Sequence, residues 1–208
     1  MSADIQSFKT YPNARQSQQE QLRKNIVNAA CSVLIEEGIE ALTVRNIAHK
    51  LECSTKIVYS LFGSKEKLVN EMFVEGCRIL TETISRIVPG DDPKEYLLGI
   101  GEAYWGFSND NSSYFRFMFG GGLQGFKPDE NSIKETAFAL SQVTEALRRY
   151  SAEGKVEAID PLITAQMLWS SLHGVLHLAI SGHFTDETRV KKLYDNNLKH
   201  MIQSLLLR

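Results

Sequence analysis

The sequence predicts an all-α protein of about nine helices, in which a small N-terminal helix-turn-helix domain is followed by a larger helical body. Apolar residues recur at helical spacing along most of the 208 residues, and strand signals are scarce. Residues 43–65 also read as two short helices joined by a tight polar turn, with another helix directly after them. We expect a flexible tail over residues 1–16, the helix-turn-helix domain over 17–70 and the body over 71–208.

The first helix is expected to begin directly after the tail. Ser17 and Glu20 form a capping-box pattern, and apolar residues then repeat at helical spacing as far as Gly38. The Gln-rich stretch 16–21 lacks the apolar core of a signal peptide, which argues against secretion. This helix would brace the two short helices that follow it.

Residues 43–62 carry the helix-turn-helix signal. Two apolar stripes are separated by the three residues from Glu52 to Ser54. Thr43 and Ser54 stand where N-cap hydroxyls are expected, and Ser64 does the same for the helix that begins at Lys65. The stripes consist of Ile47, Ala48 and Leu51, and of Val58, Leu61 and Phe62.

The second short helix would point small polar and cationic side chains outward, and almost no carboxylate interrupts that face. Such groups suit base edges and phosphates in a DNA major groove. A short amphipathic pair with a polar turn also occurs in helical proteins that never touch DNA, so the pattern alone leaves both interpretations open. The outward residues are Ser54, Thr55, Lys56, Tyr59 and Ser60.

The helix from Lys65 is expected to continue to Pro89-Gly90 as a rigid strut.

The last two helices, Pro161–Ser181 and Asp186–Leu207, are apolar on more than one face. One face can therefore serve the core and another a partner, unless both are buried within one chain. Residues 120–131 are glycine-rich but lack the ending of a phosphate loop, and we expect a flexible loop there. Other helix starts are signalled at Asp92-Pro93, Asn111-Ser112, Ser132 with Glu135, Asp160-Pro161, and Thr185 with Asp186.

Aromatic side chains crowd two adjacent helices of the body. A cavity for a small, largely apolar or aromatic effector is one explanation, and an ordinary core is the other. His173 and His177 stand four apart, a spacing that can hold zinc, but Gly174 lies where a zinc protease needs its Glu. We predict no catalytic residues, metal or cofactor, and core packing, ligand contact and metal binding all stay open for the two His residues. The effector-binding candidates are Tyr104, Trp105, Phe115, Met118, Phe119, Trp169, His173 and His177.

Composition favours a cytoplasmic protein that docks one end onto DNA. Residues 1–70 hold nine Lys or Arg against seven Asp or Glu, hence +2, whereas the remainder carries −4 within an overall charge of −2. Three widely spaced Cys residues indicate neither a disulfide framework nor a zinc site. The longest apolar segment, residues 162–180, contains Gln and His and is expected to be a buried helix rather than a membrane span.

Residues 23–68 resemble the N-terminal DNA-binding domain of the TetR (tetracycline repressor) family of transcriptional regulators. Two departures stand out. Glu52 replaces the usual Gly at a helix end that favours a left-handed backbone, which implies local strain, and Leu61 replaces an aromatic or His. The matching residues are Ile26, Ala29, Ala30, Glu37-Gly38, Thr43-Val44-Arg45, Ile47-Ala48, Val58-Tyr59, Phe62, Ser64, Lys65 and Leu68.

The resemblance implies a ligand-responsive regulator, expected to be a repressor, that binds a palindromic operator in double-stranded DNA as a homodimer. Residues 169–174 are similar to the Trp-His-Gly signature of one subgroup of TetR-like bodies. In this family the body holds the effector pocket, and its last two helices pair with their copies. On this basis Thr43, Tyr59 and Lys65 would contact phosphates, and Arg45, Thr55 and Lys56 would lie nearest the bases.

Other classes remain open from the sequence. A helical small-molecule-binding module or an enzyme that does not act on DNA would share the aromatic body but would show no salt-dependent duplex binding. Activation instead of repression also stays open. The effector, the operator sequence and the regulated genes are not encoded in any pattern that we recognise.

Overall fold

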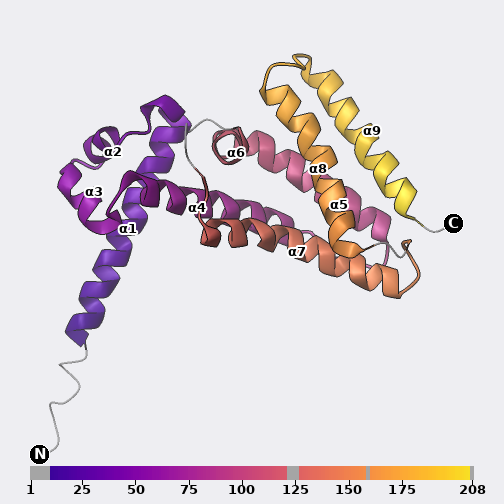
Figure 1. Ribbon diagram of the computed structural model, residues 1–208, viewed down its shortest axis with the longest axis horizontal. Helices are drawn as coiled ribbons and strands as arrows, with labels where there is room; N and C mark the ends of the chain where they lie inside the picture. Colours follow the sequence, from indigo (N-terminus) through magenta and orange to yellow (C-terminus); the bar gives the residue numbers. More distant parts are fainter. Residues whose placement is uncertain (1–9, 121–126, 158–159, 207–208) are drawn as a thin grey trace, which may run out of the picture. The chain divides into compact units, whose positions relative to one another are not determined.

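The computed structural model describes residues 10–120, 127–157 and 160–206 (Figure 1). Within them it has nine α-helices, one short 3-10 turn and no β-strand, which confirms the all-α prediction. The chain divides into two compact units, residues 1–72 and 73–208. The helices are α1 (Thr10–Glu37), α2 (Val44–Lys50), α3 (Thr55–Phe62), α4 (Lys65–Ser85), α5 (Pro93–Asp110), α6 (Ser112–Phe119), α7 (Glu130–Ala152), α8 (Pro161–Ile180) and α9 (Glu187–Leu205).

The first unit packs α1, α2, α3 and the beginning of α4 around one apolar core. Ile26, Ala30 and Val33 of α1 are fully buried. α2 and α3 are too short to be stable alone, and they fold because Ile47 and Val58, each 1% exposed, are buried in this core. The predicted stripes therefore face inward; of their other members, Ala48 and Phe62 are buried, and Leu51 and Leu61 are half-buried.

Local backbone signals determine where these helices begin and end. Thr43 Oγ1 accepts a backbone N–H of the first turn of α2 at 3.2 Å, and Ser64 Oγ does the same for α4 at 3.3 Å. Ser54 occupies the N-cap position of α3 without a hydrogen bond from its side chain. Gly38 and Gly63 end α1 and α3 with φ of 85° and 78°, a region that only glycine adopts freely. The helix boundaries predicted at Gly38, Thr43, Ser54 and Ser64 are confirmed.

The start of α1 differs from the prediction. The helix begins at Thr10 rather than Ser17, so residues 10–16 are helical instead of belonging to a tail, and residues 1–9 lie outside the described part. Gln, Arg and Glu predominate from residue 15 to residue 23, and these residue types propagate a helix without needing tertiary packing. The capping-box pattern therefore lies inside the helix.

α4 is shorter than predicted. It ends at Ser85 rather than continuing to Pro89-Gly90. The backbone N–H of Ile87 bonds to the carbonyl of Ile84 at 3.0 Å, which closes a tight final turn and stops the helix before the proline.

Two helix caps in the second unit also differ from the prediction. Asp129, not Ser132, is the N-cap of α7, because its Oδ1 accepts the Ser132 N–H at 2.9 Å. Asp186, not Thr185, caps α9 in the same way. A carboxylate is a stronger acceptor than a hydroxyl and is stabilised by the positive end of the helix, so it prevails where both are near. The caps predicted at Asp92 and Asp160 are confirmed.

The core of the second unit lies between α5, α7, α8 and α9. Tyr150 and Tyr194 are fully buried there, and their hydroxyls donate to the carbonyls of Gly90 and Gly101 at 2.9 and 2.7 Å. α5 and α9 approach closely because Gly101 has no side chain: a Cβ there would lie 2.3 Å from the Leu198 side chain.

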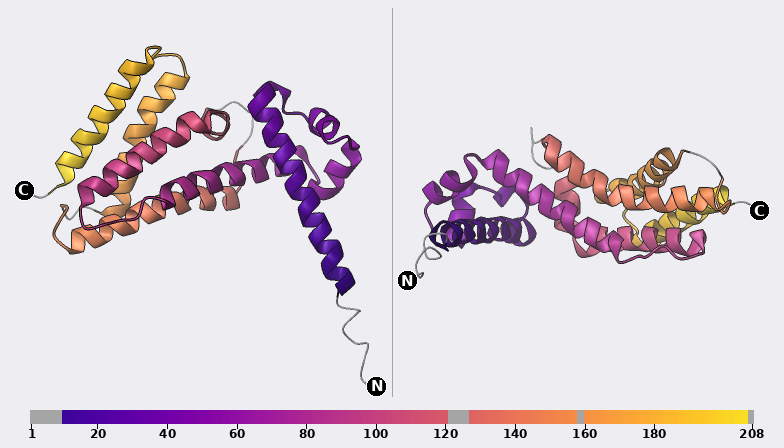
Figure 2. Two further views of the ribbon diagram at one scale, coloured as in Figure 1. Left: turned by 180° about the vertical axis from the view of Figure 1, so that it is seen from behind. Right: turned by 90° about the horizontal axis from the view of Figure 1, so that it is seen from below.

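Figures 1 and 2 show α8 and α9 as an antiparallel pair joined by a short turn. Thr164, Ala165, Leu168 and Leu172 of α8 are buried on the side that faces the core. Among the helices in the described part of the chain, none is long and apolar enough to cross a membrane.

Candidate nucleic-acid interface and ligand cavity

The outward sides of α2 and α3 are polar. The Tyr59 side chain stays 49% exposed, while Val58 beside it is buried, so the core fixes which side of α3 faces solvent. The structure brings the residues predicted to contact DNA together on neighbouring elements of the first unit. Thr43, Arg45, Ser54, Thr55, Lys56, Tyr59 and Ser60 are exposed, and Lys65 is half-buried.

This surface has features that sequence reasoning missed. His49 of α2 is exposed, and Ile57 of α3 is 37% exposed, although neither stands out from the sequence pattern. The Ser60 hydroxyl donates to the Ile57 carbonyl at 2.9 Å, so its hydrogen is already used. A hydrogen bond from Ser64 lowers the pKa of Glu66, which keeps a negative charge beside Lys65 at the start of α4.

Arg23 of α1 holds the end of α3 in place. Its guanidinium donates to the carbonyl of Leu61 and to the carboxylate of Glu71, and it lies over the Phe62 ring at 4.5 Å from the centroid. One side chain therefore ties α1 to the C-terminal turn of α3 and to α4. Leu61 and Glu71 stand 38 and 48 residues from Arg23 in the sequence, so no local pattern could have revealed these contacts.

Glu52 ends α2 in a left-handed backbone conformation. Its φ is 51°, the only positive φ at a non-glycine position among the described residues. The N–H of Glu52 bonds to the carbonyl of His49 at 3.0 Å and the N–H of Cys53 to that of Ala48 at 2.9 Å, which is the Schellman arrangement. The strain implied by the sequence departure at this position is therefore located at a helix end that favours glycine.

Replacing Glu52 with Gly is expected to stabilise the first unit by about 0.5–1 kcal/mol, because glycine adopts this φ without a Cβ penalty. Glu52→Ala is the matched control, since it removes the charge but keeps the Cβ. Thermal unfolding should show a higher Tm for Glu52→Gly than for Glu52→Ala and wild type. Equal shifts in both variants would mean that the charge, not the backbone, limits stability.

The second unit contains an apolar cavity of about 350 Å³. Side chains of α4, α5, α7, α8 and α9 line it, and Ile133 and Ala137 of α7 both line it and are exposed, so it reaches the surface near the start of α7. The volume falls in the range of small-molecule sites in proteins. The aliphatic lining includes Leu80, Ile84, Ile100, Leu140, Leu168 and Leu172.

A chain of hydrogen bonds runs from the cavity wall into the core. Trp169 Nε1 donates to Tyr104 Oη at 3.1 Å, and Tyr104 Oη lies 2.8 Å from His173 Nδ1. Burial and the neighbouring His177 ring lower the pKa of His173, which favours the neutral imidazole. Tyr104 Oη therefore accepts from Trp169 and shares a second hydrogen bond with the neutral His173 ring.

Of the eight residues predicted to bind an effector, only Tyr104 and Trp169 line this cavity. Phe115, Phe119 and His173 do not line the cavity and pack against one another. The His177 ring stacks on the His173 ring, with the ring centroids 5.9 Å apart. Met118 packs on Gly76 of α4, and Trp105 packs on Tyr194 of α9. Aromatic density identified the hydrophobic centre of the unit, whereas the cavity is mainly aliphatic.

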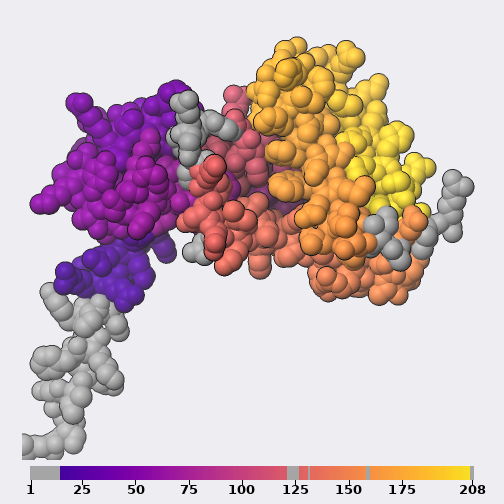
Figure 3. Space-filling model, viewed as in Figure 1, coloured from indigo at the N-terminus to yellow at the C-terminus, as the bar shows by residue number. Residues whose placement is uncertain are grey.

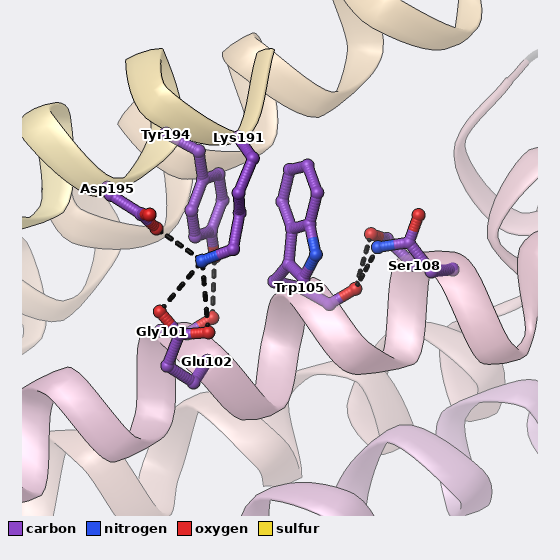
Figure 4. Close-up of polar contacts among 8 residues, drawn as sticks. Gly101, Glu102, Trp105, Ser108, Lys191, Tyr194 and Asp195 are labelled. Atoms are coloured by element: carbon purple, nitrogen blue, oxygen red, sulfur yellow. Dashed lines mark hydrogen bonds and ion pairs between the residues drawn. The ribbon is translucent and has the colours of Figure 1, made fainter. Parts of the chain in front are cut away.

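Trp105 belongs to a polar cluster that joins α5 to α9 (Figure 4). Lys191 Nζ lies 2.9 Å from Glu102 Oε1, also pairs with Asp195, and stands 5.2 Å from the centre of the Trp105 ring. Burial opposes its charge, but the two carboxylates outweigh that effect and raise the pKa of Lys191. The cluster fastens α9 to α5.

α8 also carries an exposed apolar stripe, opposite its buried side. Ile163 is 51% exposed, Met167 54% and Leu178 40%, at helical spacing on one side of the helix. Gly174 lies between them, with nothing within 4 Å of an added Cβ. Figure 3 shows α8 and α9 at the surface of the second unit. By contrast, the apolar residues of α9 lie in the chain's own core, except for exposed Leu193 and half-buried Met201.

The surroundings of His173 and His177 do not indicate a metal site within the described residues. In the part of the chain that the structure describes, no group of three or more His, Cys, Asp or Glu stands where it could hold a metal ion. The Nδ1 atom of His177 is buried without a hydrogen-bond partner. The His173 ring packs against the rings of Tyr104, Phe115, Phe119 and Trp169.

Comparison with known proteins gives two family matches. Residues 26–72 match the family described as bacterial regulatory proteins of the tetR family, and residues 97–201 match the tetracyclin repressor-like C-terminal domain. An uncharacterised HTH-type transcriptional regulator of Mycobacterium tuberculosis is 24% identical over 168 residues, which cover 79% of this chain and 72% of the relative.

Solved structures share the fold. A putative TetR-family regulator from Mesorhizobium loti superposes with a TM-score of 0.70 at 14% identity, covering 91% of this chain and 98% of that one. SmeT, the repressor of the Stenotrophomonas maltophilia multidrug efflux pump SmeDEF, superposes with a TM-score of 0.67 at 22% identity, covering 89% and 90%. With two family matches on one all-helical chain, the protein belongs to the TetR family of helix-turn-helix transcriptional regulators.

Proposed function

We propose that this protein is a homodimeric repressor that binds a palindromic operator and releases it when a small molecule occupies the cavity of the second unit. The observation that carries the proposal is the polar, exposed face of α2 and α3, whose other face is locked in the core. A two-fold dimer would place two such faces in successive major grooves. DNA binding places the site of action in the cytoplasm.

The DNA contacts divide into two kinds. Thr43, Tyr59 and Lys65 hold phosphates, Lys65 with help from the N-terminus of α4. Arg45, Thr55 and Lys56 lie nearest the base edges and set sequence preference. The exposure of Arg45, Thr55 and Lys56 supports this division, as does the half-buried position of Lys65 at a helix start.

Two lysine substitutions distinguish these roles. Lys65→Ala is expected to weaken binding to all duplexes alike and to reduce the slope of log affinity against log salt by about 1. Lys56→Ala is expected to relax preference at specific operator positions, at a cost of about 1–3 kcal/mol for the preferred base. Fluorescence anisotropy on an operator selected from genomic DNA, and on variants of it, measures both effects. Unchanged operator binding in both variants would contradict the assignment.

The dimer forms through α8 and α9. The exposed apolar side chains of Ile163, Met167 and Leu178 on one side of α8 support this interface, because such side chains are stabilised when a partner covers them. Gly174 in the middle of the stripe would let two copies of α8 approach closely.

The cavity binds its ligand without transforming it. Among the described residues that line it, only Tyr104, Thr136 and Trp169 have polar side-chain atoms, and burial raises the pKa of Tyr104. Cys77, beside Thr136, is 1% exposed and burial raises its pKa, so its thiol is a poor nucleophile. Ligand binding would favour a conformer in which the two helix-turn-helix domains of the dimer are wrongly spaced for the operator. By linkage, operator binding must then lower the affinity for the ligand by the same factor as the ligand lowers the affinity for the operator.

A further inference from the structure

The polar groups of the cavity wall are already hydrogen-bonded to the protein. Trp169 Nε1 donates to Tyr104 Oη, which is also hydrogen-bonded to His173 Nδ1 at 2.8 Å. Thr136 Oγ1 donates to the Ser132 carbonyl at 3.1 Å. Each polar side chain in the described part of the wall, Tyr104, Thr136 and Trp169, is therefore already hydrogen-bonded to the protein.

The wall also carries no charge. None of the described residues that line the cavity is Asp, Glu, Lys, Arg or His. A charged ligand that entered would lose its hydration and find no counter-ion, which strongly disfavours binding.

We propose that the effector of this regulator is an uncharged hydrophobic molecule that makes no essential hydrogen bond, such as an alkyl-substituted arene or a terpene-like hydrocarbon. This inference rests on the proposed function and narrows the chemical class that acts at the cavity. The cavity of about 350 Å³ lies near the lower end of small-molecule sites and suits one compact molecule. Affinity would come from apolar contact, and selectivity from the penalty for leaving polar groups unpaired.

A matched ligand series tests the class. The probes are para-ethyltoluene, para-ethylbenzaldehyde, para-ethylbenzoate and para-ethylbenzylammonium, which share one carbon skeleton. The full-length Trp105→Phe variant leaves Trp169, in the cavity wall, as the only tryptophan, so its fluorescence reports occupancy. Calorimetry on the wild type gives independent Kd values.

The hydrocarbon is expected to bind most tightly, the aldehyde roughly tenfold more weakly, and both ions at least about a hundredfold more weakly. An ion that binds as tightly as the hydrocarbon would overturn the inference. Failure of the hydrocarbon to bind at all would do the same.

A charge placed in the wall should reverse the preference. Thr136→Lys puts a cation at the lining, and this variant is expected to gain affinity for para-ethylbenzoate and lose it for para-ethyltoluene. Glu135→Gln is the control, because it changes the net charge equally at an exposed neighbour outside the lining. Circular dichroism confirms that each variant is folded. An unchanged preference in Thr136→Lys would overturn the assignment of the ligand to this cavity.

Operator binding, measured in parallel, separates this inference from the proposed function. If the benzoate releases the operator and the hydrocarbon does not, the ligand class is wrong but the regulator stands. If the protein binds no operator while the hydrocarbon still binds most tightly, the ligand class stands and the proposed function fails.

Discussion

Replacing Met167 with Glu is expected to abolish dimer formation and to lower operator affinity by at least about a hundredfold. Met167 lies in the exposed apolar stripe of α8, one turn after Ile163, and is 54% exposed. In a two-fold interface through α8, the new carboxylate would be desolvated and would approach its own copy. A monomer can bind only one half-site of the operator, so it loses the gain in affinity that comes from linking two helix-turn-helix domains.

Phe138→Glu is the matched control for this substitution. Phe138 is also apolar and exposed, at 58%, but it lies on α7. Sedimentation equilibrium should find monomers for Met167→Glu and dimers for Phe138→Glu and wild type. If Met167→Glu remained a dimer with full operator affinity, the interface would have to lie elsewhere.

Arg23→Met is expected to destabilise the first unit by about 2 kcal/mol and to weaken operator binding. The variant keeps an unbranched apolar side chain but loses the hydrogen bonds to the Leu61 carbonyl and Glu71, and the contact with the Phe62 ring. Because these contacts hold the end of α3, the variant's α3 would spend part of its time displaced from the position that binds the operator.

Lys24→Met is the control for Arg23→Met, since Lys24 is the next residue, also basic, and exposed. Chemical denaturation and anisotropy on the selected operator measure both effects. A loss of affinity without a loss of stability would indicate that Arg23 contacts DNA directly instead of positioning α3. If Arg23→Met and Lys24→Met changed stability and operator affinity equally, only the positive charge of Arg23 would matter, not its specific contacts.

The helical frame was predictable because its signals are local. Thr43 and Asp160 accept backbone N–H groups at helix starts, and Gly38 supplies the positive φ at a helix end. The departure at Glu52 was also visible, because a family pattern with Gly at that position states a backbone requirement that Glu meets only with strain. Where two capping residues competed, as at Asp129 and Ser132, the sequence alone did not decide between them.

A cavity in the body was one of the two interpretations of its aromatic residues, but its lining and the Arg23 contacts were not predictable, because both depend on distant residues. Five helices contribute to the lining, and its aliphatic members look like ordinary core residues in the sequence. Phe115 and Phe119 drew attention as aromatics, yet they pack behind the wall. Arg23 stood only at the edge of a recognised region, and nothing near it in the sequence indicates its partners.

The most direct test of the account is the binding of the full-length protein to its selected operator and to the same duplex with one half-site scrambled. Anisotropy titration across a range of salt concentrations, with the mass of each complex, gives affinity and stoichiometry together. We predict two chains per intact operator, strong salt dependence, and an affinity at least about a hundredfold lower on the scrambled duplex. One chain per operator, or equal affinity for both duplexes, would contradict recognition by the helix-turn-helix domains of a symmetric dimer.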